Sequence, residues 1–307
     1  GDNLWQKHDS ITTENARYLP RFQQLCEKYG FKPVWLTNYE MAIDPVYIEF
    51  AKDAIARGTA EIGMHLHAWN SPPTDPLTDD DWRHKPYLIE YSDAAMRAKV
   101  DYMTRLLEET FQTKMVSHRA GRWAFDERYA RLLMEYGYLV DCSVTPRVNW
   151  KTAKGAPQGD GGTDYRHFPQ HAYFLDENDI RREGQSSLLE VPMSIQYKHP
   201  TWMNSLKQGY DRLRGKVRSP SVHWLRPMGG NVETMKKVVE QTLTQGNDYV
   251  EYMLHSSEYM PGGSPTFKNE QDIERLYADL ESFFSWLAPQ VKGMTLAEYY
   301  QQKRTQR

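Results

Sequence analysis

The sequence lacks the features of a disulfide-rich or membrane-spanning protein. Its 307 residues include only two cysteines, Cys26 and Cys142, which lie far apart and outside any CxxC pair. Neither a disulfide framework nor a zinc ribbon is therefore expected. No apolar run approaches the roughly 20 residues that cross a bilayer, so we expect no membrane span.

An excess of positive charge is also missing. The chain has 38 Lys and Arg against 41 Asp and Glu, with a net charge of -3. Binding to a phosphate backbone requires a basic surplus, so we expect no nucleic-acid partner. The first residues, Gly1 to Lys7, have neither the charged start nor the apolar stretch of a signal peptide, and this predicts a cytoplasmic protein.

Aromatic residues, in contrast, are abundant. The chain contains 9 Trp, 20 Tyr and 10 Phe, which make up 13% of its residues. This is more aromatic surface than a core alone needs, because aromatic side chains can also serve as flat binding faces. With 39% hydrophobic and 26% charged residues, the composition predicts a globular protein with an ample core.

Short apolar runs alternate with segments of helical periodicity, which is typical of βαβ units and a parallel sheet. The pattern breaks between 145 and 186, where we expect a long loop or insertion. The first periodic element is a helix from about Leu19, so a first strand is expected at or before Gly1. One α/β barrel domain over 1–307, with its first strand truncated, is the simplest prediction. Strands are expected at 33–38, 60–67, 114–119, 139–144, 188–193 and 249–255.

Polar side chains gather where these expected strands end. The carboxyl ends of parallel strands meet on one face, and catalytic groups usually come from there. Four strand ends therefore define a candidate site, through His65 and His67, His118 and Arg119, Asp141 and Ser143, and His255.

The pair His65 and His67 is the clearest candidate for metal binding. Residues two apart on a strand point the same way, so two imidazoles can reach one ion. The alternative is a pair of half-exposed histidines that bind nothing. A metal also needs a third ligand, usually a carboxylate, and Asp2 and Asp9 are the only acids near the expected end of a first strand.

Two further strand-end residues have an ordinary and a functional interpretation. Arg119 is expected to hold a catalytic carboxylate or a substrate oxygen, or else to form a plain strand-end salt bridge. His255 could donate a proton, or it could be a core or capping histidine. The glycines of 159–162 do not stand between a strand and a helix, so we interpret them as a flexible loop.

In the order of its motifs, the sequence resembles the polysaccharide deacetylase family, that is, the NodB homology domain or carbohydrate esterase family 4. It is most similar to the branch associated with surface-polysaccharide and lipopolysaccharide biosynthesis. The resemblance extends from about Tyr18 to Glu258 and implies a distorted (β/α)7 barrel. Its motifs correspond to Glu61–His67 for the metal histidines, Arg119–Trp123 for the third motif, Asp141–Ser143 for the fourth and Leu254–His255 for the fifth.

The sequence departs from the family pattern in two places. The second metal histidine usually follows the first by four residues, but here that position is Trp69 and the second histidine is His67. The acidic pair of the first motif is not evident, which leaves Asp2 as the best candidate and Asp9 as the second.

The resemblance implies metal-dependent hydrolysis of N-acetyl groups on a glycan or glycan precursor of surface-polysaccharide biosynthesis. It implies a divalent ion, Zn²⁺ or else Co²⁺ or Ni²⁺, and a carbohydrate substrate. The implied roles are metal binding by His65, His67 and Asp9, catalysis by His255, Arg119 and Asp2, and substrate binding by Trp69, Trp123, Arg122 and Ser143.

Two other functions stay open. A catalytically inactive, carbohydrate-binding relative would keep the barrel and its aromatic cleft but not the acids. A different HxH metallohydrolase, such as a phosphoesterase, is the other alternative. Those enzymes use more histidines and acids on later strands than this sequence offers.

Overall fold

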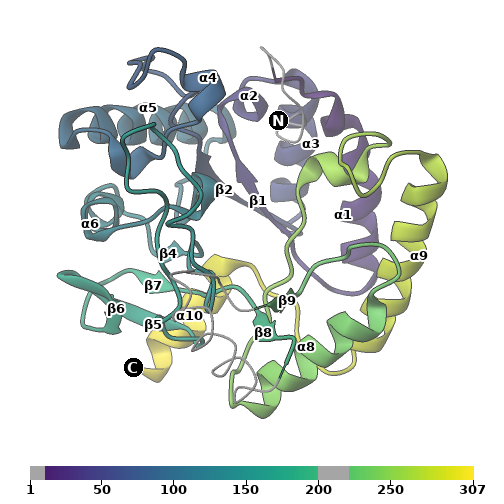
Figure 1. Ribbon diagram of the computed structural model, residues 1–307. Coiled ribbons are helices and arrows are strands. Elements are labelled where there is room, and N and C mark those ends of the chain that lie inside the picture. The colour runs from purple at the N-terminus through teal and green to yellow at the C-terminus, as the bar shows by residue number, and fades with distance from the viewer. Residues whose placement is uncertain (1–10, 200–220) are drawn as a thin grey trace, which may run out of the picture.

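A curved sheet rich in parallel strands forms the centre of the molecule. The computed structural model describes residues 11–199 and 221–307, and Figure 1 shows helices arranged around the strands. Neighbouring strands β1 to β4 and β7 all pair in parallel, which confirms the predicted parallel α/β architecture. The parallel strands are β1 (Val34–Thr37), β2 (Glu61–Leu66), β3 (Ser117–Ala120), β4 (Val140–Asp141) and β7 (Leu189–Glu190).

The helices pack their apolar faces onto this sheet and onto one another. The largest buried cluster joins Leu19, Met64, Val100, Leu133 and Leu280, which come from both sides of the fold. Within the described ranges, no helix is both long and apolar enough to cross a membrane. The longer helices are α1 (Leu19–Lys28), α3 (Pro45–Ala56), α5 (Asp93–Phe111), α6 (Glu127–Glu135), α8 (Val232–Thr244), α9 (Glu270–Leu287) and α10 (Leu296–Gln306). The short helical segments are η1 (Glu14–Tyr18), α2 (Tyr39–Ala42), α4 (Asp81–His84), η2 (Leu88–Glu90), η3 (Gly121–Trp123) and η4 (Ser256–Tyr259).

The register between β2 and β3 positions the strand-end residues. His65 pairs with Arg119 and Leu66 with Ala120. The two strands approach closely at Gly63, where a Cβ atom would lie 2.8 Å from the backbone oxygen of Ser117. Glycine at this position therefore lets β2 and β3 keep the register that brings His65 beside Arg119.

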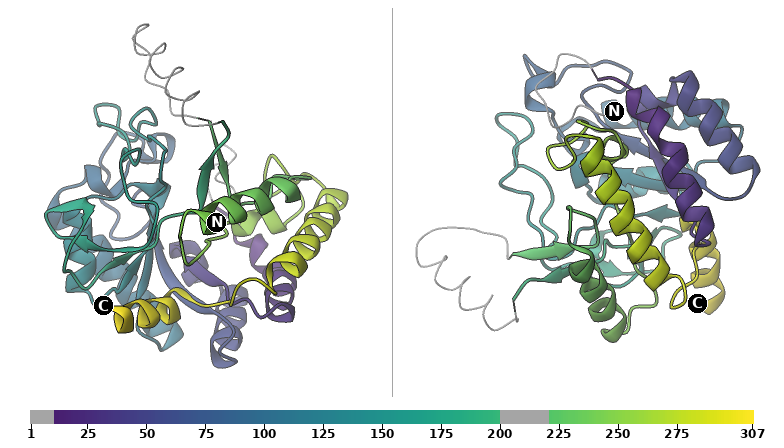
Figure 2. Two further views of the ribbon diagram at one scale, coloured as in Figure 1. Left: turned by 90° about the horizontal axis from the view of Figure 1, so that it is seen from below. Right: turned by 90° about the vertical axis from the view of Figure 1, so that its right-hand side faces the viewer.

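The stretch from 145 to 186 is more ordered than expected. Its second half forms the antiparallel hairpin of β5 (Tyr173–Asp176) and β6 (Asp179–Glu183), and β5 pairs with β7 at the edge of the main sheet. A separate antiparallel pair, β8 (Ile195–Tyr197) and β9 (Val222–Trp224), was not expected from the sequence. This pair projects from the body of the fold (Figure 2).

The expected strand at 249–255 runs extended but joins no ladder, which corrects that prediction. The amide of Glu251 donates to Ser194 Oγ at 2.9 Å, and the amide of Met253 donates to the Leu225 oxygen at 3.2 Å. On the other side, β1 is an edge strand of the described sheet. A seam therefore separates β1 from 249–255, and closure of a seven-stranded barrel stays a prediction, as does a single domain over 1–307.

Candidate active site at the strand ends

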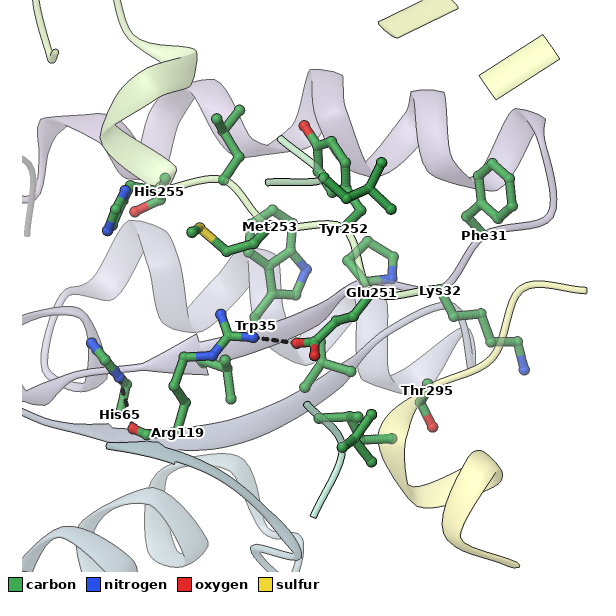
Figure 3. Close-up of a pocket in the computed structure, with 18 of the residues that line it drawn as sticks. Phe31, Lys32, Trp35, His65, Arg119, Glu251, Tyr252, Met253, His255 and Thr295 are labelled. Carbon is green, nitrogen blue, oxygen red and sulfur yellow. Dashed lines mark hydrogen bonds and ion pairs between the residues drawn. The ribbon is translucent and has the colours of Figure 1, made fainter. Parts of the chain in front are cut away.

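A cavity of about 830 Å³ follows this seam. At one end it reaches the carboxyl ends of β2 and β3, where His65, His67, Arg119 and His255 line it together. Figure 3 shows His65 and Arg119 on one wall and His255 on the other. The structure thus brings together four residues that the sequence placed at three different strand ends. Asp2 and Asp9 lie outside the described residues.

The imidazole of His65 has a defined orientation. Its Nδ1 lies 2.8 Å from the backbone oxygen of Arg119. A carbonyl oxygen only accepts hydrogen bonds, so Nδ1 carries the proton and the lone pair is on Nε2. Burial lowers the pKa of His65 to about 3, so the ring is neutral at pH 7. A hydrogen bond from the non-ligating nitrogen to a carbonyl is also typical of metal-binding histidines.

His67 is buried beside it and carries an unsatisfied nitrogen. The ring centroids of His65 and His67 are 4.6 Å apart, and His67 stacks on Trp69 at 4.5 Å with an interplanar angle of 16°. Its Nδ1 has no hydrogen-bond partner among the described residues. Burial, with a smaller contribution from His65, lowers the pKa of His67 well below its usual value. An unpaired buried nitrogen on a neutral imidazole is the kind of donor that a metal ion uses.

The histidine pair alone does not make a complete metal site. Within residues 11–199 and 221–307, no group of three His, Cys, Asp or Glu side chains is placed to hold an ion. His65 and His67 therefore offer two donors that fit a metal. A complete site would need a third donor in addition to these two imidazoles.

Arg119 has a carboxylate partner that the sequence analysis missed. Its Nη2 forms an ion pair with Glu251, and its Nε donates to the Cys142 backbone oxygen at 3.2 Å. The guanidinium also lies 4.9 Å from the centroid of the Trp123 ring. Glu251, Met253 and His255 alternate along an extended segment, so this spacing could have placed Glu251 on the same side as His255.

The environment of Glu251 is unusual for a carboxylate. Its side chain is 14% exposed, and burial raises its pKa to about 7 although the charge of Arg119 opposes the shift. One carboxylate oxygen, Oε2, is buried and accepts no hydrogen bond among the described residues. Glu251 thus faces the cavity as a carboxyl group that can change protonation near neutral pH.

His255 lies across the cavity from His65 and contacts the carboxylate of Glu258. Its Nδ1 lies 3.2 Å from Glu258 Oε2, and the same oxygen accepts from Arg226 Nη2 at 2.6 Å. Burial alone would raise the pKa of Glu258, but the hydrogen bond from His255 and the charge of Arg226 keep it below the usual value. Glu258 is therefore ionised, and its hydrogen bond with Nδ1 orients the His255 ring.

Arg122 and Trp123 adopt a backbone conformation that is rare for such side chains. Their φ angles are +53° and +64°, which costs about 1–3 kcal/mol at each residue. The surrounding contacts hold them: Arg122 Nη2 donates to the Lys154 oxygen at 3.0 Å, and the Tyr165 hydroxyl donates to the Trp123 oxygen at 2.5 Å. Both side chains line the cavity, as does Trp69. Strain at such a position is typical of functional sites.

Ser143 does not lie in the cavity, which corrects the expectation that it binds substrate. It is fully buried, where its hydroxyl donates to Asp141 at 2.9 Å and accepts from the Ala120 amide at 2.7 Å. Asp141 also contacts His118 Nδ1 at 2.6 Å. These residues form a buried polar network that joins β3 to β4 behind the site.

Comparison with known proteins gives matches among solved structures. A protein from Mycobacterium smegmatis described as a polysaccharide deacetylase matches 94% of this chain and 77% of its own, with a TM-score of 0.52 and 16% identity. The chain has a polysaccharide deacetylase-like fold. A 4-alpha-glucanotransferase from Thermococcus litoralis matches 97% of this chain and 38% of its own, with a TM-score of 0.50 and 12% identity.

A third structural match is partial. The match with the CE4 family pseudoenzyme from Bacillus anthracis covers 46% of this chain and 43% of that protein, with a TM-score of 0.32 and 15% identity. No protein-family model and no curated protein matches the sequence.

Proposed function

We propose that this protein is a metal-dependent N-deacetylase that acts on a glycan or glycan precursor in surface-polysaccharide biosynthesis. One observation supports this most directly. Two neutral imidazoles, His65 and His67, lie side by side near Arg119 and His255 in one cavity at the strand ends. The deacetylase-like fold agrees with this proposal.

The proposed cofactor is Zn²⁺, with Co²⁺ or Ni²⁺ as alternatives that suit the same nitrogen donors. When bound, such an ion supplies Lewis-acid polarisation of the acetyl carbonyl and lowers the pKa of a water molecule. His65 Nε2 and the imidazole of His67 would hold it. Asp9 stays the proposed third ligand, and Asp2 the proposed base.

His255 is the proposed proton donor to the departing amine. Its Nδ1 is directed at the ionised Glu258, so Nε2 is the nitrogen that can carry the proton to be transferred. The contact with Glu258 orients the imidazole, as a general acid requires. The leaving amine would otherwise depart as an unstable anion.

The aromatic side chains around the cavity suit a carbohydrate ligand. Trp69, Trp123 and Trp150 line the same cavity as the histidines, and indole faces stack well on the apolar faces of sugar rings. The guanidinium of Arg122, which lines the same cavity, adds hydrogen-bond donors. We therefore propose Trp69, Trp123 and Arg122 as substrate contacts.

Acetate release tests the proposal. The purified chain, loaded with Zn²⁺, Co²⁺ or Ni²⁺, is incubated with the N-acetylglucosamine trimer, and free acetate is measured. We expect release that EDTA abolishes and that His255→Ala reduces by about 10²- to 10⁴-fold, the usual range for a general acid. The matched control is His171→Ala, since His171 is an exposed residue paired with Glu183.

A non-catalytic carbohydrate-binding function is the second candidate. The observation that favours it is the lack of a three-ligand cluster among the described residues. It predicts that the trimer binds in a calorimetric titration but releases no acetate with any of the three metals. Acetate release would exclude it.

A further inference from the structure

The Arg119 guanidinium is held by contacts through Nε and Nη2, and its third nitrogen, Nη1, is available to donate a hydrogen bond to a ligand. Nε donates to the Cys142 oxygen, and Nη2 contacts Glu251 and, at 3.4 Å, the sulfur of Met193. No hydrogen bond from Nη1 is seen to any described residue. Figure 3 shows the guanidinium in the cavity, directed from the His65 wall toward Glu251.

Glu251 is the only carboxylate that forms an ion pair with Arg119 in the described part of the chain. Both side chains are largely buried, at 12% and 14% exposure. A buried arginine loses its water shell, and a charged partner then decides where the guanidinium lies. Without this carboxylate, the backbone oxygen of Cys142 and the Trp123 ring would be left to hold a mobile side chain.

We infer that Glu251 is a positioning residue, which holds Arg119 so that its Nη1 donates to an oxygen of the bound substrate. The inference rests on the proposed deacetylase function and adds to it a residue that acts through another. Arg119 is rigid and preorganised only while Glu251 is ionised. A hydrogen bond from a fixed cation is worth more in such a cavity than one from a flexible cation.

The protonation of Glu251 should therefore affect substrate recognition. Its pKa of about 7 is set by burial, with Arg119 and the Cys142 thiol lowering it and Asp141 raising it. Below neutral pH the carboxyl becomes neutral and the ion pair weakens. Five titratable or charged groups face the Glu251 carboxyl. They are Arg119 on β3, Asp141 on β4 and Cys142 directly after it, Glu190 on β7, and Tyr249 on the same extended segment as Glu251.

The experiment compares the zinc-loaded wild type with E251Q, E251D and the control E27Q. Glu27 and Asp53 both pair with Arg57 at the surface, so E27Q removes one acidic partner of an arginine without touching the cavity. The measurements are zinc content, kcat and KM for acetate release from the N-acetylglucosamine trimer over pH 5–9, and calorimetric binding of the trimer.

We expect E251Q to keep its zinc and to lose about 10- to 100-fold in kcat/KM, the loss expected for a hydrogen bond to a charged group. An ionisation near pH 7 in the wild-type profile should be missing in E251Q and present again in E251D. E27Q should match the wild type.

Other outcomes overturn the inference. If E251Q keeps the wild-type pH profile and kcat/KM, Glu251 does not position Arg119 for substrate. If E251Q or E251D loses zinc, Glu251 supports the metal site or the fold instead. If the wild type itself releases no acetate, the proposed function fails and the inference fails with it.

Discussion

Nδ1 of His65 lies 2.8 Å from the backbone oxygen of Arg119, across the ladder that joins β2 to β3. This contact fixes one tautomer, so the Nε2 lone pair is left for a ligand. His67 lies next to it with a buried and unsatisfied Nδ1. The register of two parallel strands thus places two imidazoles with available nitrogens side by side.

Removing either imidazole should remove the metal. We expect His65→Ala and His67→Ala to lower the zinc content, measured by mass spectrometry after gel filtration, from about one ion per chain to near zero, because two remaining ligands hold zinc poorly. His171→Ala, at an exposed site, should keep it. Zinc retained by the His65→Ala, His67→Ala double variant would show that the ion binds elsewhere.

A methyl group at Gly121 should disturb His67. A Cβ there would lie 2.3 Å from the Leu66 oxygen and 2.9 Å from His67 Cδ2. We expect Gly121→Ala to lower the free energy of unfolding by about 1–3 kcal/mol, as for overpacking, and to weaken zinc binding.

Gly137→Ala is the matched control for that variant. It meets no atom within 4 Å, and its φ is +83°, so it should cost only about 1 kcal/mol of backbone strain. Zinc affinity equal in both variants would contradict the role of Gly121 in placing His67.

The raised pKa of Glu251 should make stability depend on pH. The folded state holds a proton up to about pH 7, whereas the unfolded carboxyl releases it near pH 4.5. The free energy of unfolding should therefore fall as pH rises through this window, by up to about 3 kcal/mol from this group. Urea titrations at pH 4.5 to 8 should show a smaller decline for E251Q. Parallel curves would mean that Glu251 titrates at its usual pKa.

The seam beside β1 should be visible in amide exchange. The Glu61 amide donates to the Pro33 oxygen at 3.0 Å, so by alternation the amides of Trp35 and Thr37 face β2, and those of Val34 and Leu36 face the cavity. We expect Val34 and Leu36 to exchange at the earliest times in an NMR hydrogen-exchange series, and Trp35 and Thr37 to be protected. Equal protection of all four would indicate that another segment pairs with this edge.

The sequence was sufficient to predict which strand ends meet. Alternating strands and helices imply parallel pairing, and parallel pairing brings His65, His67 and Arg119 to one edge. His255 lines the same cavity as these residues although its segment forms no ladder, because the chain still returns to the carboxyl-terminal edge of the parallel sheet. The parallel sheet was predicted for the same reason.

Side-chain partners were harder to predict. Ser143 follows the same strand-end rule as His67, but its hydroxyl is turned to Asp141 and away from the cavity. The alternation of Glu251 with His255 could have placed both on one side of the segment, but only the three-dimensional fold shows that Arg119 reaches Glu251. The β5–β6 hairpin lay in a region whose period is broken by turns, where periodicity gives little information.

Anomalous diffraction at the zinc edge, from crystals of the zinc-loaded protein, tests the central claim most directly. The account predicts a single strong peak about 2.0–2.1 Å from a nitrogen of both His65 and His67, with an oxygen ligand completing the site. A peak at another position, or no peak at the histidine pair under saturating zinc, would contradict it.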